Sequence, residues 1–144
     1  MAGCHFWVAT AMTVLVTASC GAAPPVTAGG PNLAGTAWVA ETIAGGGVVG
    51  PAESVIRFED DQRVSGHGGC NAFTGTYEIR GEQIVLGPLA TTRRACGAAI
   101  DEQERRFLAA LSDIGRYEVE DGLLLLFAHD SVTATRLASK PGAE

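Results

Sequence analysis

The sequence predicts an α+β domain, in which a compact, strongly curved antiparallel β-sheet of roughly eight short strands packs against one α-helix. Three observations indicate this fold class. Short apolar stretches recur between glycine-rich or acidic turns, which is typical of antiparallel strands. A single segment, near residues 100–111, repeats apolar residues at helical spacing. The part of the chain that carries these patterns, residues 33–138, has the length of one domain.

Residues 1–20 have the composition of a signal peptide with a lipobox-like end. The apolar run from Phe6 to Val16 is too short to span a bilayer comfortably as a helix. Small residues and then Cys20 follow, which resembles the lipobox of bacterial lipoproteins, although Thr17 replaces the usual leucine and no lysine or arginine precedes the run. We expect export, with lipidation at Cys20. The alternative is an ordinary secretory signal that leaves Cys20 as a free thiol.

Residues 21–32 are expected to form a tether, because they are rich in Gly, Ala and Pro and carry no charge. Behind a lipid anchor, this segment would hold the domain off the membrane surface. Residues 33–138 form the expected domain, in which we find no internal repeat, and residues 139–144 are expected to be a short tail.

The charge of the chain excludes one class of partner. The sequence has 10 Lys and Arg against 16 Asp and Glu, a formal net charge of −6. Its arginines are scattered, and the pairs at 93–94 and 105–106 are interpreted as solvated faces. Without a basic surface, we expect no nucleic acid partner.

The first strands are predicted from apolar alternation and turn residues. Residues 38–43 form the first candidate, which ends at the glycines of 45–47. Residues 55–58 and 63–65 flank the acidic turn at 59–62, so we expect a hairpin there.

The central strands form a second predicted hairpin. Residues 73–79 alternate aromatic residues with small or polar ones, and residues 83–86 follow the turn at Arg80-Gly81-Glu82. Such alternation is typical of a strand with one buried face.

The last strands close the chain. Residues 116–120 alternate, with Tyr117 on the buried face, and Asp121-Gly122 is a strong two-residue turn signal. The continuous apolar run at 123–127 is short enough for a fully buried strand, and residues 132–137 form the last candidate.

The predicted helix interrupts this series of strands. Asp101 is the expected N-cap, Glu104 completes a capping-box pattern, and Gly115 stands where a C-terminal cap is expected. The apolar residues that would pack on the sheet are Ile100, Phe107, Leu108 and Leu111.

The four cysteines predict one disulfide. Cys4 lies in the segment to be removed and Cys20 is the lipidation candidate, which leaves Cys70 and Cys96 as a pair in an oxidising compartment. A zinc site is the rival use of these cysteines, but the sequence offers no CxxC or HxxxH spacing, and His67 is the one histidine near Cys70.

A glycine-rich bend around Cys70 carries the strongest family resemblance. The chain resembles the META domain family, which includes the HslJ-type heat-inducible envelope lipoproteins, over nearly all of residues 33–138. The family motif matches best at Gly69, Cys70, Asn71, Phe73, Gly75, Tyr77, Thr92 and Cys96. The resemblance implies a β-rich fold with one helix, in exported proteins associated with stress or drug tolerance and with secretion or motility, without an assigned catalytic chemistry.

The residue types Cys70, His67 and Asn71 would also suit a cysteine hydrolase. In an oxidising compartment, however, Cys96 offers the thiol a disulfide partner. Asn71 and Thr92 are more simply interpreted as side chains that hydrogen-bond to nearby backbone. Trp38, Phe73 and Tyr77 are expected to be core. We therefore expect no catalytic residue, no cofactor and no metal ligand.

Together with the resemblance to the META family, these observations predict a non-enzymatic exported lipoprotein of the cell envelope, held to the membrane through its lipid anchor or otherwise secreted. Its domain would support stress or drug tolerance by binding an envelope protein or a small ligand. The alternative is a small exported ligand-binding or protease-inhibitor module. An exposed apolar patch or an open sheet mouth would separate the two.

Overall fold

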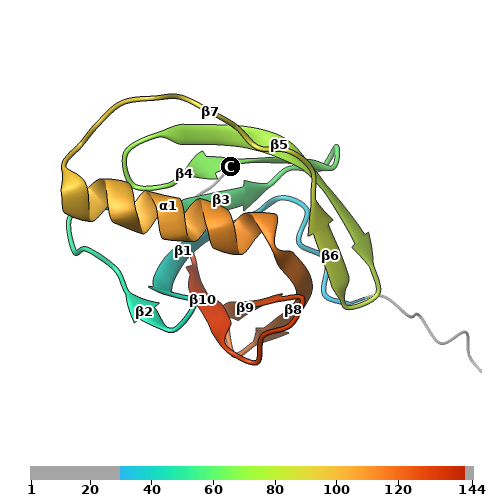
Figure 1. Cartoon of the computed structure of the whole chain (residues 1–144). Coiled ribbons are helices and arrows are strands. Elements are labelled where there is room, and N and C mark those ends of the chain that lie inside the picture. The colour runs from blue at the N-terminus through green and yellow to red at the C-terminus, as the bar shows by residue number, and fades with distance from the viewer. Residues whose placement is uncertain (1–29, 142–144) are drawn as a thin grey trace, which may run out of the picture.

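Figure 1 shows a computed structural model of the chain, which describes residues 30–141. The expected signal peptide, the expected lipidation at Cys20 and most of the expected tether lie outside the described residues.

Eight strands form a closed antiparallel barrel. The predicted curved sheet is therefore confirmed, and the structure adds that the sheet closes on itself. Neighbouring strands pair in the order β10-β9-β8-β6-β5-β4-β3-β1, and β10 also pairs with β1. The barrel strands are β1 (Thr36–Ile43), β3 (Val55–Phe58), β4 (Arg63–His67), β5 (Ala72–Arg80), β6 (Gln83–Leu86), β8 (Ile114–Glu120), β9 (Leu123–Ala128) and β10 (Ala134–Ser139). Two short strands, β2 (Gly46–Gly47) and β7 (Ala90–Thr91), add to β1 and β5 outside this ring.

The last strand begins later than its sequence indicates. Val132, the predicted start, is 94% exposed in a turn that the Ser131 side chain stabilises by hydrogen bonds to the backbone of Thr133. β10 then continues to Ser139, the residue at which we expected the tail to begin. The next residue, Lys140, donates its backbone N–H to the carbonyl oxygen of Ala37.

The helix α1 (Ala98–Ser112) begins three residues before the predicted N-cap. Gly97 precedes it with a φ of 103°, and Asp101 and Glu104, which we expected to cap it, lie within it. The predicted C-cap is also wrong, because Asp113 is the C-cap residue of α1 and Gly115 lies inside β8. A side chain at Gly115 would collide with the ring of His129, which explains the need for glycine there.

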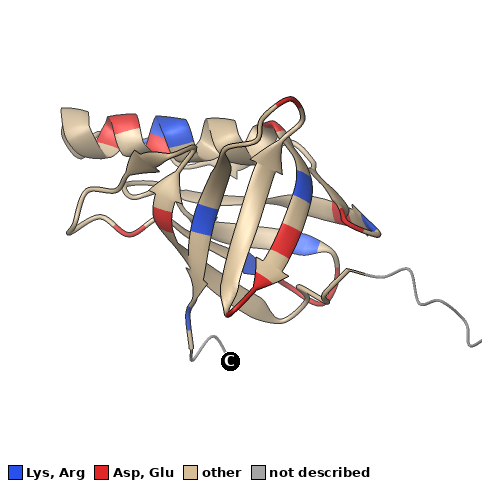
Figure 2. Ribbon diagram, turned by 90° about the horizontal axis from the view of Figure 1, so that it is seen from below, with Lys and Arg blue, Asp and Glu red and all other residues tan. Residues whose placement is uncertain are grey.

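The helix crosses one end of the barrel and covers its opening (Figures 1 and 2). Phe107 and Leu111 are fully buried, as predicted, whereas Ile100 and Leu108 are half-buried. The ring of Phe107 lies 6.2 Å from that of Phe73 in β5, measured between centroids. The helix therefore closes the core from above as well as lying on the sheet.

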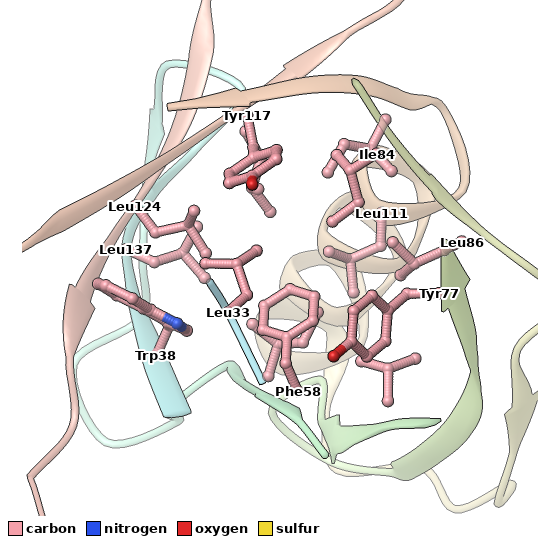
Figure 3. Packing of buried hydrophobic residues seen from close by; sticks show 14 of the residues in the cluster. Leu33, Trp38, Phe58, Tyr77, Ile84, Leu86, Leu111, Tyr117, Leu124 and Leu137 are labelled. Atoms are coloured by element: carbon pink, nitrogen blue, oxygen red, sulfur yellow. The ribbon is translucent and has the colours of Figure 1, made fainter. Parts of the chain in front are cut away.

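The core fills the barrel between its strands (Figure 3), and the predicted aromatic residues Trp38, Phe73 and Tyr77 are buried in it. Leu33, just before β1, is fully buried among these side chains. Nearby, the hydroxyl of Tyr117 donates to the carbonyl oxygen of Pro31 at 2.9 Å. Burial, followed by the negative charge of Glu82, raises the pKa of Tyr117 above its ordinary value.

Three turns that are rich in acidic residues lie at one end of the barrel. The chain enters the barrel where Thr36 pairs with Phe58, and the same end holds the β3–β4, β5–β6 and β8–β9 turns. These turns are rich in carboxylates (Figure 2): Glu59, Asp60, Asp61, Glu82, Glu120 and Asp121. The opposite end carries α1, the β4–β5 bend and the β9–β10 turn.

Candidate functional site

The β4–β5 bend brings Cys70 and Asn71 beneath the start of α1. A side chain at Gly66 would collide with the carbonyl oxygen of Val55 and the ring of Phe73. Gly69 has a φ of 130°, which side chains disfavour. The bend closes through the Gly68 N–H, which donates to the carbonyl oxygen of Asn71 at 2.9 Å.

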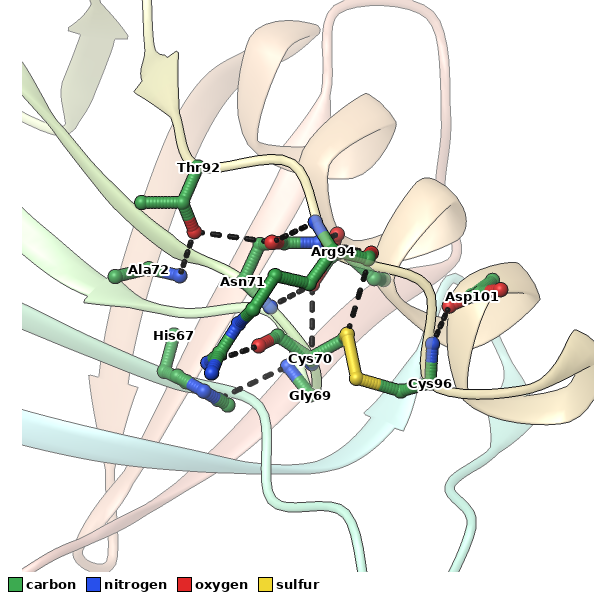
Figure 4. Close-up of a disulfide and its surroundings, with 10 residues drawn as sticks. His67, Gly69, Cys70, Asn71, Ala72, Thr92, Arg94, Cys96 and Asp101 are labelled. Carbon is green, nitrogen blue, oxygen red and sulfur yellow. Dashed lines mark hydrogen bonds between the residues drawn. A yellow bond between two sulfur atoms is a disulfide. The ribbon is translucent and has the colours of Figure 1, made fainter.

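The structure contains the predicted disulfide between Cys70 and Cys96 (Figure 4). Their Cα atoms are 5.8 Å apart and the two residues are separated by 26 positions in the sequence. Cys70 is buried, whereas Cys96 is exposed two residues before α1. The bond therefore joins the bend to the segment that leads into the helix.

The side chain of Asn71 binds that same segment with both ends of its amide. Its Oδ1 accepts hydrogen bonds from the Arg94 backbone N–H at 2.7 Å and from the Thr92 hydroxyl at 2.9 Å. Its Nδ2 donates to the Arg94 carbonyl oxygen at 3.0 Å and to Glu104 Oε1 at 2.7 Å. Asn71 therefore binds backbone, as expected, but the expectation that this backbone is nearby is wrong, because Arg94 lies 23 residues along the chain.

Glu104, like Asp101 and Gly115, does not have the capping role predicted from the sequence. Its carboxylate does not cap its own helix; Oε2 accepts hydrogen bonds from the backbone N–H groups of Cys70 and Asn71 in the bend. Helical periodicity could not indicate this, because the donors lie 33 and 34 residues away.

Thr92 and Arg94 complete the arrangement. The Thr92 hydroxyl accepts a hydrogen bond from the Ala72 N–H at 3.2 Å, as expected for a group that satisfies backbone. The Arg94 guanidinium donates to the carbonyl oxygen of Cys70 at 3.3 Å. We name Cys70, Asn71, Thr92, Arg94, Cys96 and Glu104 the clasp, since together they fasten α1 and its preceding segment to the barrel.

The remaining motif residues lie outside the clasp. Phe73 and Tyr77 point into the core, where the ring of Tyr77 meets that of Phe58 edge-on at 5.0 Å. Burial, and then the charges of Asp60 and Asp61, raise the pKa of Tyr77. A side chain at Gly75 would press against Leu89.

Cys70 and His67, which were considered for cysteine hydrolysis, interact with other groups in the structure. The sulfur of Cys70 is bonded to Cys96, so residue 70 has no thiol while the disulfide is intact. His67 accepts a hydrogen bond at Nδ1 from the Gly69 N–H. Among the described side chains, no buried polar atom lacks a hydrogen-bond partner.

A groove of about 370 Å³ lies at the same end of the barrel, between α1, the β1–β2 turn and the β9–β10 turn. Its apolar part is formed by Ile43, Ala44, Ala109, Ala110, Leu126 and Ala128. Polar groups contribute the rest: Arg105, Arg106, Asp113, Ser131, Thr133 and Thr135. The Arg106 guanidinium donates to the carbonyl oxygen of Gly47 at 3.0 Å. Arg105 donates to Glu102, and this hydrogen bond holds the pKa of Glu102 below its ordinary value.

Comparison with known families identifies the domain. The family model described as META domain matches residues 31–141, which include the barrel, the helix and the clasp. The chain belongs to the META domain family. The matched residues include Cys70 and Cys96, and their disulfide is compatible with an exported protein.

Two solved structures share the fold of this META domain. An NMR structure of a protein from Burkholderia xenovorans is 24% identical and has a TM-score of 0.65, with 76% of this chain and 85% of that chain covered. A second NMR structure is 22% identical and has a TM-score of 0.58, with 74% and 90% covered. Comparison with the curated proteins finds no match. Within residues 30–141, no helix has the length and hydrophobicity needed to cross a membrane.

Proposed function

We propose that this META protein is a non-enzymatic, exported protein of the cell envelope that binds a partner through the groove beside α1. The observation that carries the proposal is the groove itself, because alanine side chains of α1 and of the strand ends line it at one end of a closed barrel, above the buried Ile43 and Leu126. The clasp supports this assignment, since its polar groups are occupied in holding α1, which forms one wall of the groove.

The position of the groove also suits an anchored protein. The described chain enters the barrel at the end opposite α1, so a lipid at Cys20 would tether the domain by its acidic end. The groove would then face away from the membrane and be available to other envelope components. Stable anchoring requires more than one acyl chain, as a lipoprotein cysteine carries. We infer that the bound partner supports envelope integrity under stress or drug exposure.

A second candidate function is capture of a small ligand. The groove volume of about 370 Å³ lies at the lower end of the range for small-molecule sites, roughly 300–1,000 Å³. Its mixed lining of alanine, leucine and arginine side chains suits an amphipathic molecule. Both candidate functions therefore use the same groove, and they differ in whether it binds a protein partner or a small molecule.

Filling the groove tests both candidates. Ala109 is exposed on α1 and lines the groove, so Ala109→Trp should obstruct it while leaving the core intact. In host cells that lack the protein, we expect wild type to restore survival under envelope stress and Ala109→Trp to fail at equal expression. Ala99→Trp, exposed on the same helix but away from the groove, is the matched control and should complement.

Full complementation by Ala109→Trp would contradict a role for the groove. Native mass spectrometry of the purified protein then separates the two candidates. A small molecule that accompanies wild type and Ala99→Trp, but is absent from Ala109→Trp, would favour the ligand-binding module over the partner-binding protein.

A further inference from the structure

The Cys70–Cys96 disulfide and the side chain of Asp101 converge at the entrance to α1, and both thiolates and a carboxylate can coordinate a metal once the disulfide is reduced. Cys70 Sγ, Cys96 Sγ and a carboxylate oxygen of Asp101 all lie within 4.8 Å of one another. Asp101 Oδ1 accepts a hydrogen bond from the backbone N–H of Cys96 at 3.0 Å, which keeps the carboxylate beside the disulfide (Figure 4). A carboxylate has a second oxygen, so this hydrogen bond is compatible with coordination.

We propose that reduction of the disulfide converts this group into a site for a zinc-class divalent ion. A dithiol reductant supplies two electrons and is itself oxidised to a disulfide, while Cys70 and Cys96 become thiols. Binding of the metal then displaces the two thiol protons, so both sulfurs coordinate as thiolates together with the Asp101 carboxylate. This site is separate from the groove and does not depend on its function.

The dimensions of the group suit zinc. Tetrahedral zinc has Zn–S bonds of about 2.3 Å and Zn–O bonds of about 2.0–2.2 Å, which place its ligand atoms roughly 3.6–3.8 Å apart. The observed limit of 4.8 Å requires only small movements of the carboxylate, and the sulfurs separate when their bond is broken. Three protein ligands leave the fourth position for water, and two thiolates favour zinc over calcium or magnesium.

The clasp would keep the ligands together after reduction. Asn71 binds both backbone groups of Arg94, two residues before Cys96, and Glu104 binds the backbone of Cys70 from α1. These hydrogen bonds join the same elements as the disulfide without using the sulfur atoms. Cys96 is exposed, which gives a reductant access to the disulfide, and its place before a helix N-terminus favours the thiolate.

Titration with Co²⁺ alone, followed by competition with Zn²⁺, tests the site on the purified full chain. We expect the reduced protein to bind one Co²⁺ with thiolate-to-cobalt charge-transfer absorption, and the oxidised protein to show none. Asp101→Asn retains an oxygen that can accept from the Cys96 N–H, but it should weaken binding by more than about tenfold, since loss of even an outer-shell partner has that effect. Asp130→Asn, exposed in the β9–β10 turn, is the matched control and should bind like wild type.

Three results would overturn the proposal. One is a reduced protein that keeps its far-ultraviolet circular dichroism but shows no charge-transfer band. Another is loss of that circular dichroism on reduction, which would mean that the ligands do not stay together. The third is equal Co²⁺ affinity of Asp101→Asn and wild type, which would mean that the two thiolates bind the metal without the Asp101 carboxylate.

Discussion

Replacing Cys96 by alanine is expected to lower the free energy of unfolding by about 3–4 kcal/mol. The disulfide closes a loop of 26 residues, and the chain-entropy model gives a stabilisation of this size for such a loop. Cys96 is exposed, so its replacement reports the loss of the cross-link with little loss of packing. Urea denaturation followed by circular dichroism measures the change.

The matched variants are Cys70→Ala and the double replacement. Because both single variants break the same bond, we expect similar losses, with a small additional cost at Cys70 for its buried side chain. The double variant should add little to either single one. Two independent losses that sum in the double variant would contradict the structural role of the pair.

Replacing Phe107 by alanine is expected to cost about 3–5 kcal/mol, the usual range for a buried phenylalanine. Phe107 is fully buried on the face of α1 that covers the barrel, and its ring packs against Phe73. The substitution therefore leaves a cavity between the helix and the barrel. Chemical denaturation measures the loss, and helical circular dichroism shows whether α1 stays in place.

Arg105→Ala is the matched control for Phe107, because the Arg105 side chain is 69% exposed on the same helix. Its loss should change stability by less than about 0.5 kcal/mol, as for most surface substitutions. A Phe107→Ala variant as stable as this control would mean that α1 contributes little to closing the core.

The strands could be predicted because their residues alternate locally, but the closure of the barrel could not. Tyr117 and its alternating neighbours, for example, define a buried face within one strand. The ring closes through β1 and β10, where Trp38 pairs with Ser139. No local pattern connects residues so far apart, and only the summed twist and curvature of the sheet bring these strands together.

The clasp was partly predictable for the same physical reason. Cys70 and Cys96 could be predicted as a pair because they are the two cysteines that remain once Cys4 and Cys20 are assigned to the signal segment. Glu104 was assigned to its own helix because a capping box is a local pattern, whereas its observed donors belong to the β4–β5 bend. The groove lay beyond prediction, because its lining comes from a helix and strands distant in sequence.

A double-mutant cycle between Asn71 and Glu104 tests most directly whether the clasp fastens α1 to the barrel. Asn71 donates its amide to Glu104 Oε1, and the Asn71 N–H binds Glu104 Oε2. We predict that Asn71→Ala and Glu104→Ala each destabilise the protein, with a coupling energy of about 1–3 kcal/mol between them. Losses that add to within about 0.5 kcal/mol would contradict the clasp.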